Sequence, residues 1–98
     1  MTTIDSDLVG LHAFSSDGAK LGKVKRVFET GGRRYVEIGG FLTRDLIVPA
    51  EGAHKTTDER VELSYKNIYL DRAPEHRGKS EPTQEELSRI DQFFRTAA

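Results

Sequence analysis

Six lysine and arginine side chains gather between residues 20 and 34, and Glu29 is the one acidic residue among them. Six positive charges against one negative give the segment a formal charge of +5, whereas the whole chain has a net charge of −1. Clustered cations indicate nucleic-acid or phosphate recognition, but they also occur on the solvated face of a sheet. Tyr35 follows the cluster and could stack on a base. The candidate nucleic-acid-binding residues are Lys23, Lys25, Arg26, Arg33 and Arg34.

Apolar side chains near the C-terminus repeat at the spacing of one helix face. Thr83 and Glu86 have the spacing of a capping box and Pro82 precedes them, so residues 83–96 are predicted to form an amphipathic helix. A helix of about 14 residues is marginal alone in water, so its apolar stripe needs a surface to cover it. That surface can belong to the rest of this chain, to a second copy or to another protein. The candidate partner-binding residues are Leu87, Ile90, Phe93 and Phe94.

Most residue types that carry enzyme chemistry are missing or badly spaced. The chain has no cysteine, which excludes a disulfide, a thiol nucleophile and a cysteine-ligated metal centre. His12, His54 and His76 lack the i,i+2 or i,i+4 spacing of a zinc pair. Neighbouring carboxylates, such as Glu85 and Glu86, fit a helix N-terminus or a solvated turn. We therefore predict no catalytic residues, no metal site, no cofactor and no enzymatic activity.

The elements that must position these residues are mostly short strands. Apolar and polar residues alternate between glycine-rich turns, which is typical of strands with one face buried. The alternation slips between Val24 and Phe28, which predicts a β-bulge near Arg26. We therefore expect a mainly β fold, a small barrel of five to six strands with a C-terminal α-helix, because closure removes exposed strand edges. The predicted strands are residues 8–14, 21–29, 33–38, 44–48 and 60–64.

Length and composition indicate one small domain. The chain has 98 residues, 36% hydrophobic and 32% charged, so we expect a thin core under a well-solvated surface. Residues 1–7 are predicted to be a flexible N-terminus, 8–74 the barrel domain and 75–82 a linker to the helix. The longest apolar run, Leu46 to Ala50, is far shorter than the ~20 residues of a membrane helix. Without a signal-peptide pattern, we expect a cytoplasmic protein with no membrane insertion.

The barrel region carries its structural glycines and core aliphatic residues in a characteristic order. Its elements are Leu8–Phe14, Asp17-Gly18, Leu21-Gly22, Val24 and Val27 at the start, then Leu46–Pro49, and finally Val61–Leu63, Ile68 and Ala73-Pro74. This order resembles the PRC-barrel family: an opening hairpin, an aliphatic-proline element and a closing segment. The resemblance covers residues 8–74, about two-thirds of the chain, and it implies a small β-barrel of the PRC type.

The same resemblance also implies a class of function. One member of the PRC-barrel family is a domain of the photosynthetic reaction centre H subunit. Another closes the ribosome maturation factor, which binds a small-subunit ribosomal protein. The shared theme is a non-catalytic adaptor barrel. We therefore expect a non-enzymatic interaction module that binds a protein partner or itself as a homodimer. The alternative is RNA or ribosome-assembly binding through the basic sheet face.

Overall fold

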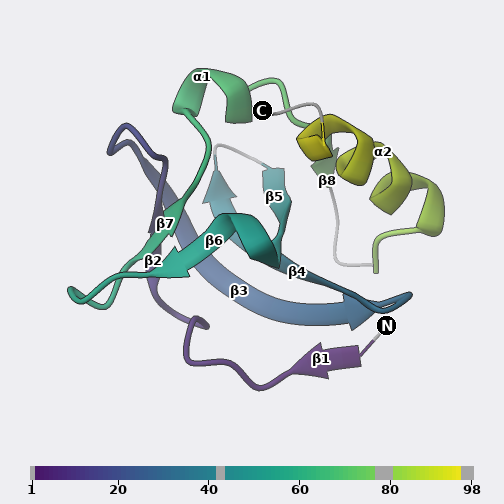
Figure 1. The fold of residues 1–98 in the computed structure, drawn as a ribbon, viewed down its shortest axis with the longest axis horizontal. Helices are drawn as coiled ribbons and strands as arrows, with labels where there is room; N and C mark the ends of the chain where they lie inside the picture. The colour runs from purple at the N-terminus through teal and green to yellow at the C-terminus, as the bar shows by residue number, and fades with distance from the viewer. Residues whose placement is uncertain (1, 42–43, 77–80, 96–98) are drawn as a thin grey trace.

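A single curved sheet forms the body of the molecule. The computed structural model describes residues 2–41, 44–76 and 81–95, and within these ranges eight strands pair into one sheet (Figure 1). The strands are β1 (Thr2–Ile4), β2 (His12–Phe14), β3 (Lys20–Thr30), β4 (Arg33–Phe41), β5 (Arg44–Pro49), β6 (Ala53–Lys55), β7 (Val61–Leu63) and β8 (Glu75–His76). The helices are the 3-10 turn η1 (Ala50–Gly52), α1 (Asn67–Leu70) and α2 (Gln84–Arg95). The strand order is β6-β7-β2-β3-β4-β5-β8, and β1 pairs with β3.

The fold class predicted from the sequence is confirmed, with more strands than expected. The structure is mainly β and carries one helix at its C-terminal end. Eight strands replace the predicted five to six because β1, β6 and β8 have only two or three residues each. Strands that short cannot show an alternating pattern. No helix in the described ranges is long and apolar enough to cross a membrane.

The β3–β4 hairpin is the longest pairing in the sheet and contains the predicted bulge. Gly31 and Gly32 connect the two strands with φ values of +60° and +78°, as a tight two-residue turn requires. The pairing shifts register between Val24 and Arg26, so the bulge expected near Arg26 is confirmed and Lys25 is its extra residue. A bulge bends its strand, and β3 follows a long curve across the molecule (Figure 1).

The hairpin is buried on both of its faces. Val36 and Ile38 lie on the inner face and are fully buried, as predicted from the alternation of β4. Tyr35 and Glu37 lie on the opposite face, where the sequence allowed a solvated surface, yet they are only 2% and 3% exposed. The Tyr35 hydroxyl hydrogen-bonds α2, so the helix covers this second face. The sequence alone could not show that α2 covers this face of the hairpin.

Helix α2 packs on the barrel of its own chain. Leu87, Ile90 and Phe94 are 3%, 2% and 6% exposed and belong to the core, and Phe93 packs partly buried against it. This corrects their assignment as an open partner-binding surface: of the three surfaces that could cover the stripe, the structure shows the chain's own. Tyr65 and Tyr69 supply it, and their ring centroids lie 4.7 Å from Phe94 and 4.4 Å from Phe93, respectively.

Three predicted boundaries differ from the structure at the ends of the barrel. The segment expected to be flexible contains β1, whose Thr2, Thr3 and Ile4 pair with Glu29, Phe28 and Val27 of β3. The first predicted strand, 8–14, is a turn up to Gly10 and a strand only from His12. The predicted linker, 75–82, begins with β8, which pairs with β5. The part of that linker at 77–80 lies outside the described residues, as do residues 96–98.

Replacing Phe94 with Ala should lower the free energy of unfolding by about 3–5 kcal/mol, the usual result of removing a buried phenyl ring. That is a large fraction of the stability of a domain this size. Urea denaturation followed by circular dichroism measures the change. Ser88→Ala, on the exposed side of α2, is the matched control and should be near neutral. Equal stability of Phe94→Ala and wild type would contradict the docking of α2 on its own barrel.

Replacing Gly22 with Ala should destabilise the β3–β4 pairing. A Cβ there would lie 2.0 Å from the carbonyl oxygen of Gly39, and the φ of +150° is strained for any side chain. Such backbone strain alone costs about 1–3 kcal/mol, so the total loss should exceed that of Gly18→Ala. Gly18 has φ +88° but open space around its Cβ position. Thermal melting of both variants separates the clash from the strain, and a Gly22 variant no worse than the Gly18 variant would refute the close contact.

Candidate functional site

The five cations predicted to bind nucleic acid do not form one patch. Lys23 pairs with Gly39 at one end of the β3–β4 hairpin, whereas Arg33 pairs with Thr30 beside the turn at the other end. Their positions on β4, Gly39 and Arg33, are six residue steps apart, which is about 20 Å along a strand. The bulge at Lys25 further breaks the alternation that would have aligned the side chains. The prediction that these cations share one face of the sheet is therefore wrong.

Carboxylates neutralise four of the five. The Lys25 ammonium lies 2.8 Å from an Asp45 oxygen, and the Arg26 guanidinium lies 2.5 Å from a Glu37 oxygen. Two more pairs, each at 3.3 Å, join Arg33 to Asp91 and Arg34 to Glu29. Asp45 and Asp91 are far from the cations in sequence, so the local charge of +5 overstated the positive field.

Glu37 is the most deeply buried of these carboxylates. Its side chain is 3% exposed and accepts a hydrogen bond from Arg26. Burial raises the pKa of Glu37 and the neighbouring Asp45 adds to the effect, while Arg26 opposes it. The hydrogen bond that Lys25 donates to Asp45 raises the pKa of Lys25, which keeps that ammonium charged in the pair. The Arg26, Glu37, Lys25 and Asp45 side chains thus form one compact charge network rather than a free basic face.

Tyr35 is not available to stack on a base. Its ring packs against Phe28 with 5.4 Å between centroids, and its hydroxyl donates to the Asp91 carboxylate at 2.9 Å. Burial and this hydrogen bond raise the pKa of Tyr35 to about 12. The residue therefore connects β4 to α2, which corrects the base-stacking role suggested by the sequence.

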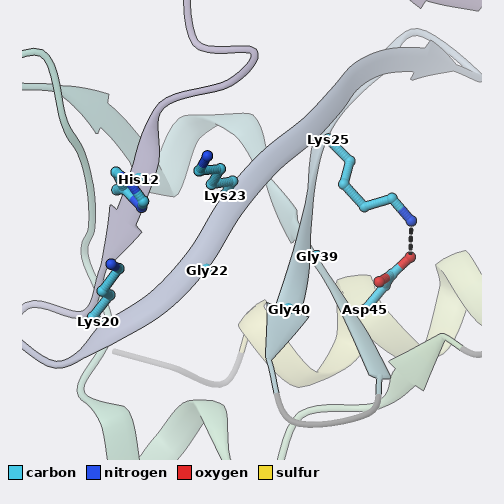
Figure 2. Close-up of a pocket in the computed structure, with 8 residues that line it drawn as sticks. All are labelled: His12, Lys20, Gly22, Lys23, Lys25, Gly39, Gly40 and Asp45. Atoms are coloured by element: carbon cyan, nitrogen blue, oxygen red, sulfur yellow. Dashed lines mark hydrogen bonds and ion pairs between the residues drawn. The ribbon is translucent and has the colours of Figure 1, made fainter.

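Lys23 is the one of the five candidate cations that forms no ion pair with the described residues, and it lines a surface pocket. The pocket has a volume of about 430 Å³, and His12, Lys20, Gly22, Lys23, Lys25, Gly39, Gly40 and Asp45 line it. Figure 2 shows His12, Lys20 and Lys23 together on the β2 side and the Lys25–Asp45 pair on the other. Lys20 and Lys23 are exposed and form no ion pair with the described part of the chain. Within the described ranges, no three metal-ligating side chains gather.

His12 lies within the predicted strand 8–14, and the sequence gives it no site role. The signal that could have found it is the hairpin register. His12 of β2 pairs directly with Lys23 of β3, and Phe14 pairs with Lys20. A turn at residues 15–18 between the two predicted strands brings these positions opposite one another. The candidate site is therefore the His12–Lys20–Lys23 group rather than the five-residue face.

A hydrogen bond between His76 and Glu86 joins β8 to the start of α2. The His76 ring nitrogen Nδ1 lies 2.8 Å from a Glu86 carboxylate oxygen, and His76 is only 3% exposed. Glu86 also accepts a hydrogen bond from the backbone N–H of Thr83, while the Thr83 hydroxyl accepts one from the backbone N–H of Glu86. This reciprocal pair confirms the predicted capping box. The hydrogen bond with His76 is the main cause that lowers the pKa of Glu86.

Comparison with protein families identifies the barrel. A model of the RimM PRC barrel domain matches residues 5–72. The matched region runs from the segment after β1 to the end of α1 and its following turn, so it includes β2 to β7 and stops before β8 and α2. No curated protein matches the chain.

Replacing Glu86 with Gln should make stability less dependent on pH in the acidic range. Because the folded pKa of Glu86 lies below its reference value of 4.5, the charged carboxylate stabilises the fold above about pH 4.5. This stabilisation is lost as the pH falls through the folded pKa. Urea denaturation at several pH values should show a deficit of the variant at pH 7 that shrinks toward pH 3. Glu85→Gln, on the exposed Glu85–Arg89 pair, is the control. A deficit constant with pH would contradict the charged contact.

Proposed function

The chain belongs to the RimM PRC barrel domain family, and from this membership we propose that it is a non-enzymatic protein-interaction module that acts in ribosome assembly. The observation that carries the proposal is the family match, which spans most of the barrel. The resemblance to the ribosome maturation factor implies a small-subunit ribosomal protein as the partner. A role of this kind would place the protein in the cytoplasm.

A protein partner is favoured over RNA bound through the five predicted cations. Four of these cations are held by carboxylates of the same chain. An RNA phosphate would have to compete with Asp45, Glu37, Asp91 and Glu29 for them. Each such exchange would break an existing pair, so its net gain would be small. RNA binding by this route is the second candidate, and it differs from protein docking in its salt dependence.

Self-association through the α2 stripe is a weaker form of the proposal. Leu87, Ile90 and Phe94 are covered by the barrel, so a dimer that used them would require α2 to leave its own barrel. Exposing each of these side chains costs about 1.5–3 kcal/mol unless a second copy covers it. Exchange of α2 between two copies is the arrangement that meets this condition. We therefore favour a monomeric adaptor over a dimer formed through α2.

Binding to ribosomal components tests the proposal. The tagged chain is incubated with small ribosomal subunits, and separately with the protein fraction of those subunits freed of RNA. We expect it to retain a specific ribosomal protein from the RNA-free fraction, identified by mass spectrometry. Lys25→Gln/Arg34→Gln, which removes two exposed cations, should bind equally well.

Two results would contradict protein docking. Binding to neither preparation would remove the ribosome-assembly proposal. Binding only to particles that contain RNA, with an affinity that falls steeply with salt, would favour the RNA alternative. Five phosphate contacts to a single strand predict a slope of about −3.5 in log affinity against log salt.

A further inference from the structure

The pocket in Figure 2 brings a histidine and two lysines together on neighbouring strands. His12 on β2 lies opposite Lys23 on β3, and Lys20 lies two pairing positions further along the same hairpin, opposite Phe14. The Nδ1 atom of His12 is buried and has no hydrogen-bond partner among the described residues. Other atoms cover it, so the groups that a ligand in this pocket can reach are the exposed Lys20 and Lys23 side chains and the rest of the partly exposed ring.

Three glycines keep the floor of this pocket free of side chains. Gly22 packs so closely on β4 that a Cβ would lie 2.0 Å from the Gly39 oxygen. A Cβ on Gly39 would lie 2.3 Å from the Lys25 side chain, and Gly40 has a φ of +87°. The backbone itself therefore forms the floor. The volume of about 430 Å³ is within the range of small-ligand pockets.

The charge around His12 is positive and unbalanced. Lys20 lowers the pKa of His12 most, followed by burial, Lys23 and Arg60, so the imidazole is neutral at pH 7. These are the charged groups that act on His12: the two lysines on β3 and Arg60 just before β7. Asp45 lies at the far side of the pocket, where Lys25 holds it at 2.8 Å. Repulsion between the cations is relieved when an anion lies between them.

We propose that this pocket binds a phosphate group. Lys20 and Lys23 supply charge-assisted hydrogen bonds, for which an ammonium is a common phosphate donor. His12 lies beside them, and its ring adds a third positive charge when it is protonated. The phosphate can be free in solution or part of a phosphodiester backbone, and both present the same oxygens. This site is independent of the ribosome-assembly proposal, which rests on the family match.

The test follows the His12 ring by NMR while inorganic phosphate is added at constant ionic strength. The chain has three histidines, and His12→Gln identifies the His12 signal by its loss. Phosphate should raise the pKa of His12, since an anion stabilises the protonated ring, and binding should tighten as the pH falls. In Lys20→Gln/Lys23→Gln, binding should weaken at least about tenfold. Lys66→Gln, an exposed lysine on the N-terminal side of α1, is the matched control and should behave as wild type.

An oligouridylate titration distinguishes the two sources of phosphate. If the source is a phosphodiester, the oligonucleotide competes with inorganic phosphate for the His12 signal, and each lysine removed lowers the salt slope by about 1. If the source is free phosphate, inorganic phosphate alone moves the signal. Either result supports the site. An unchanged His12 pKa with both ligands would overturn it, as would an equal response in the double variant, whose exposed substitutions leave the fold intact.

Discussion

The apolar stripe of α2, formed by Leu87, Ile90, Phe93 and Phe94, packs on the barrel and completes the core of this small domain. A 98-residue chain with 36% hydrophobic residues has few apolar side chains with which to build a core. The β3–β4 hairpin is buried on both faces, and α2 contributes to the cover of the face that carries Tyr35. The Tyr65 and Tyr69 rings complete this packing against Phe94 and Phe93. Without α2, these aromatic side chains would face water.

The packing of α2 also determines which basic side chains form ion pairs. Asp91 comes from α2, and it holds Arg33 while it accepts the hydrogen bond from Tyr35. The docking of the helix thus removes a cation from the surface that the sequence marked as basic. Asp45 of β5 does the same to Lys25. Of the six cations between residues 20 and 34, Lys20 and Lys23 form no ion pair with the described residues, and they lie near His12 at the opposite end of the hairpin.

The features that sequence predicted correctly are local ones. The Gly31-Gly32 turn, the bulge near Arg26 and the Thr83–Glu86 capping box each depend on residues within a few positions of one another. The PRC-barrel fold followed from an ordered set of glycines and aliphatic residues, and the family match agrees with it. The errors are non-local. The short strand β1 is ordered by pairing with β3, and the ion pairs of Lys25 and Arg33 join residues 20 or more positions apart. The two partners of such a contact lie too far apart in the chain for a local sequence pattern to link them.

The packing of α2 on the barrel of its own chain can be tested in solution. Light scattering on the full chain across a dilution series is the most direct test, because an apolar stripe buried on its own barrel is not available to join two copies. We expect a molar mass of 11.0 kDa at every concentration. A mass twice that value, falling to the monomer when the chain is ended at Pro74, would contradict it by placing α2 between two copies.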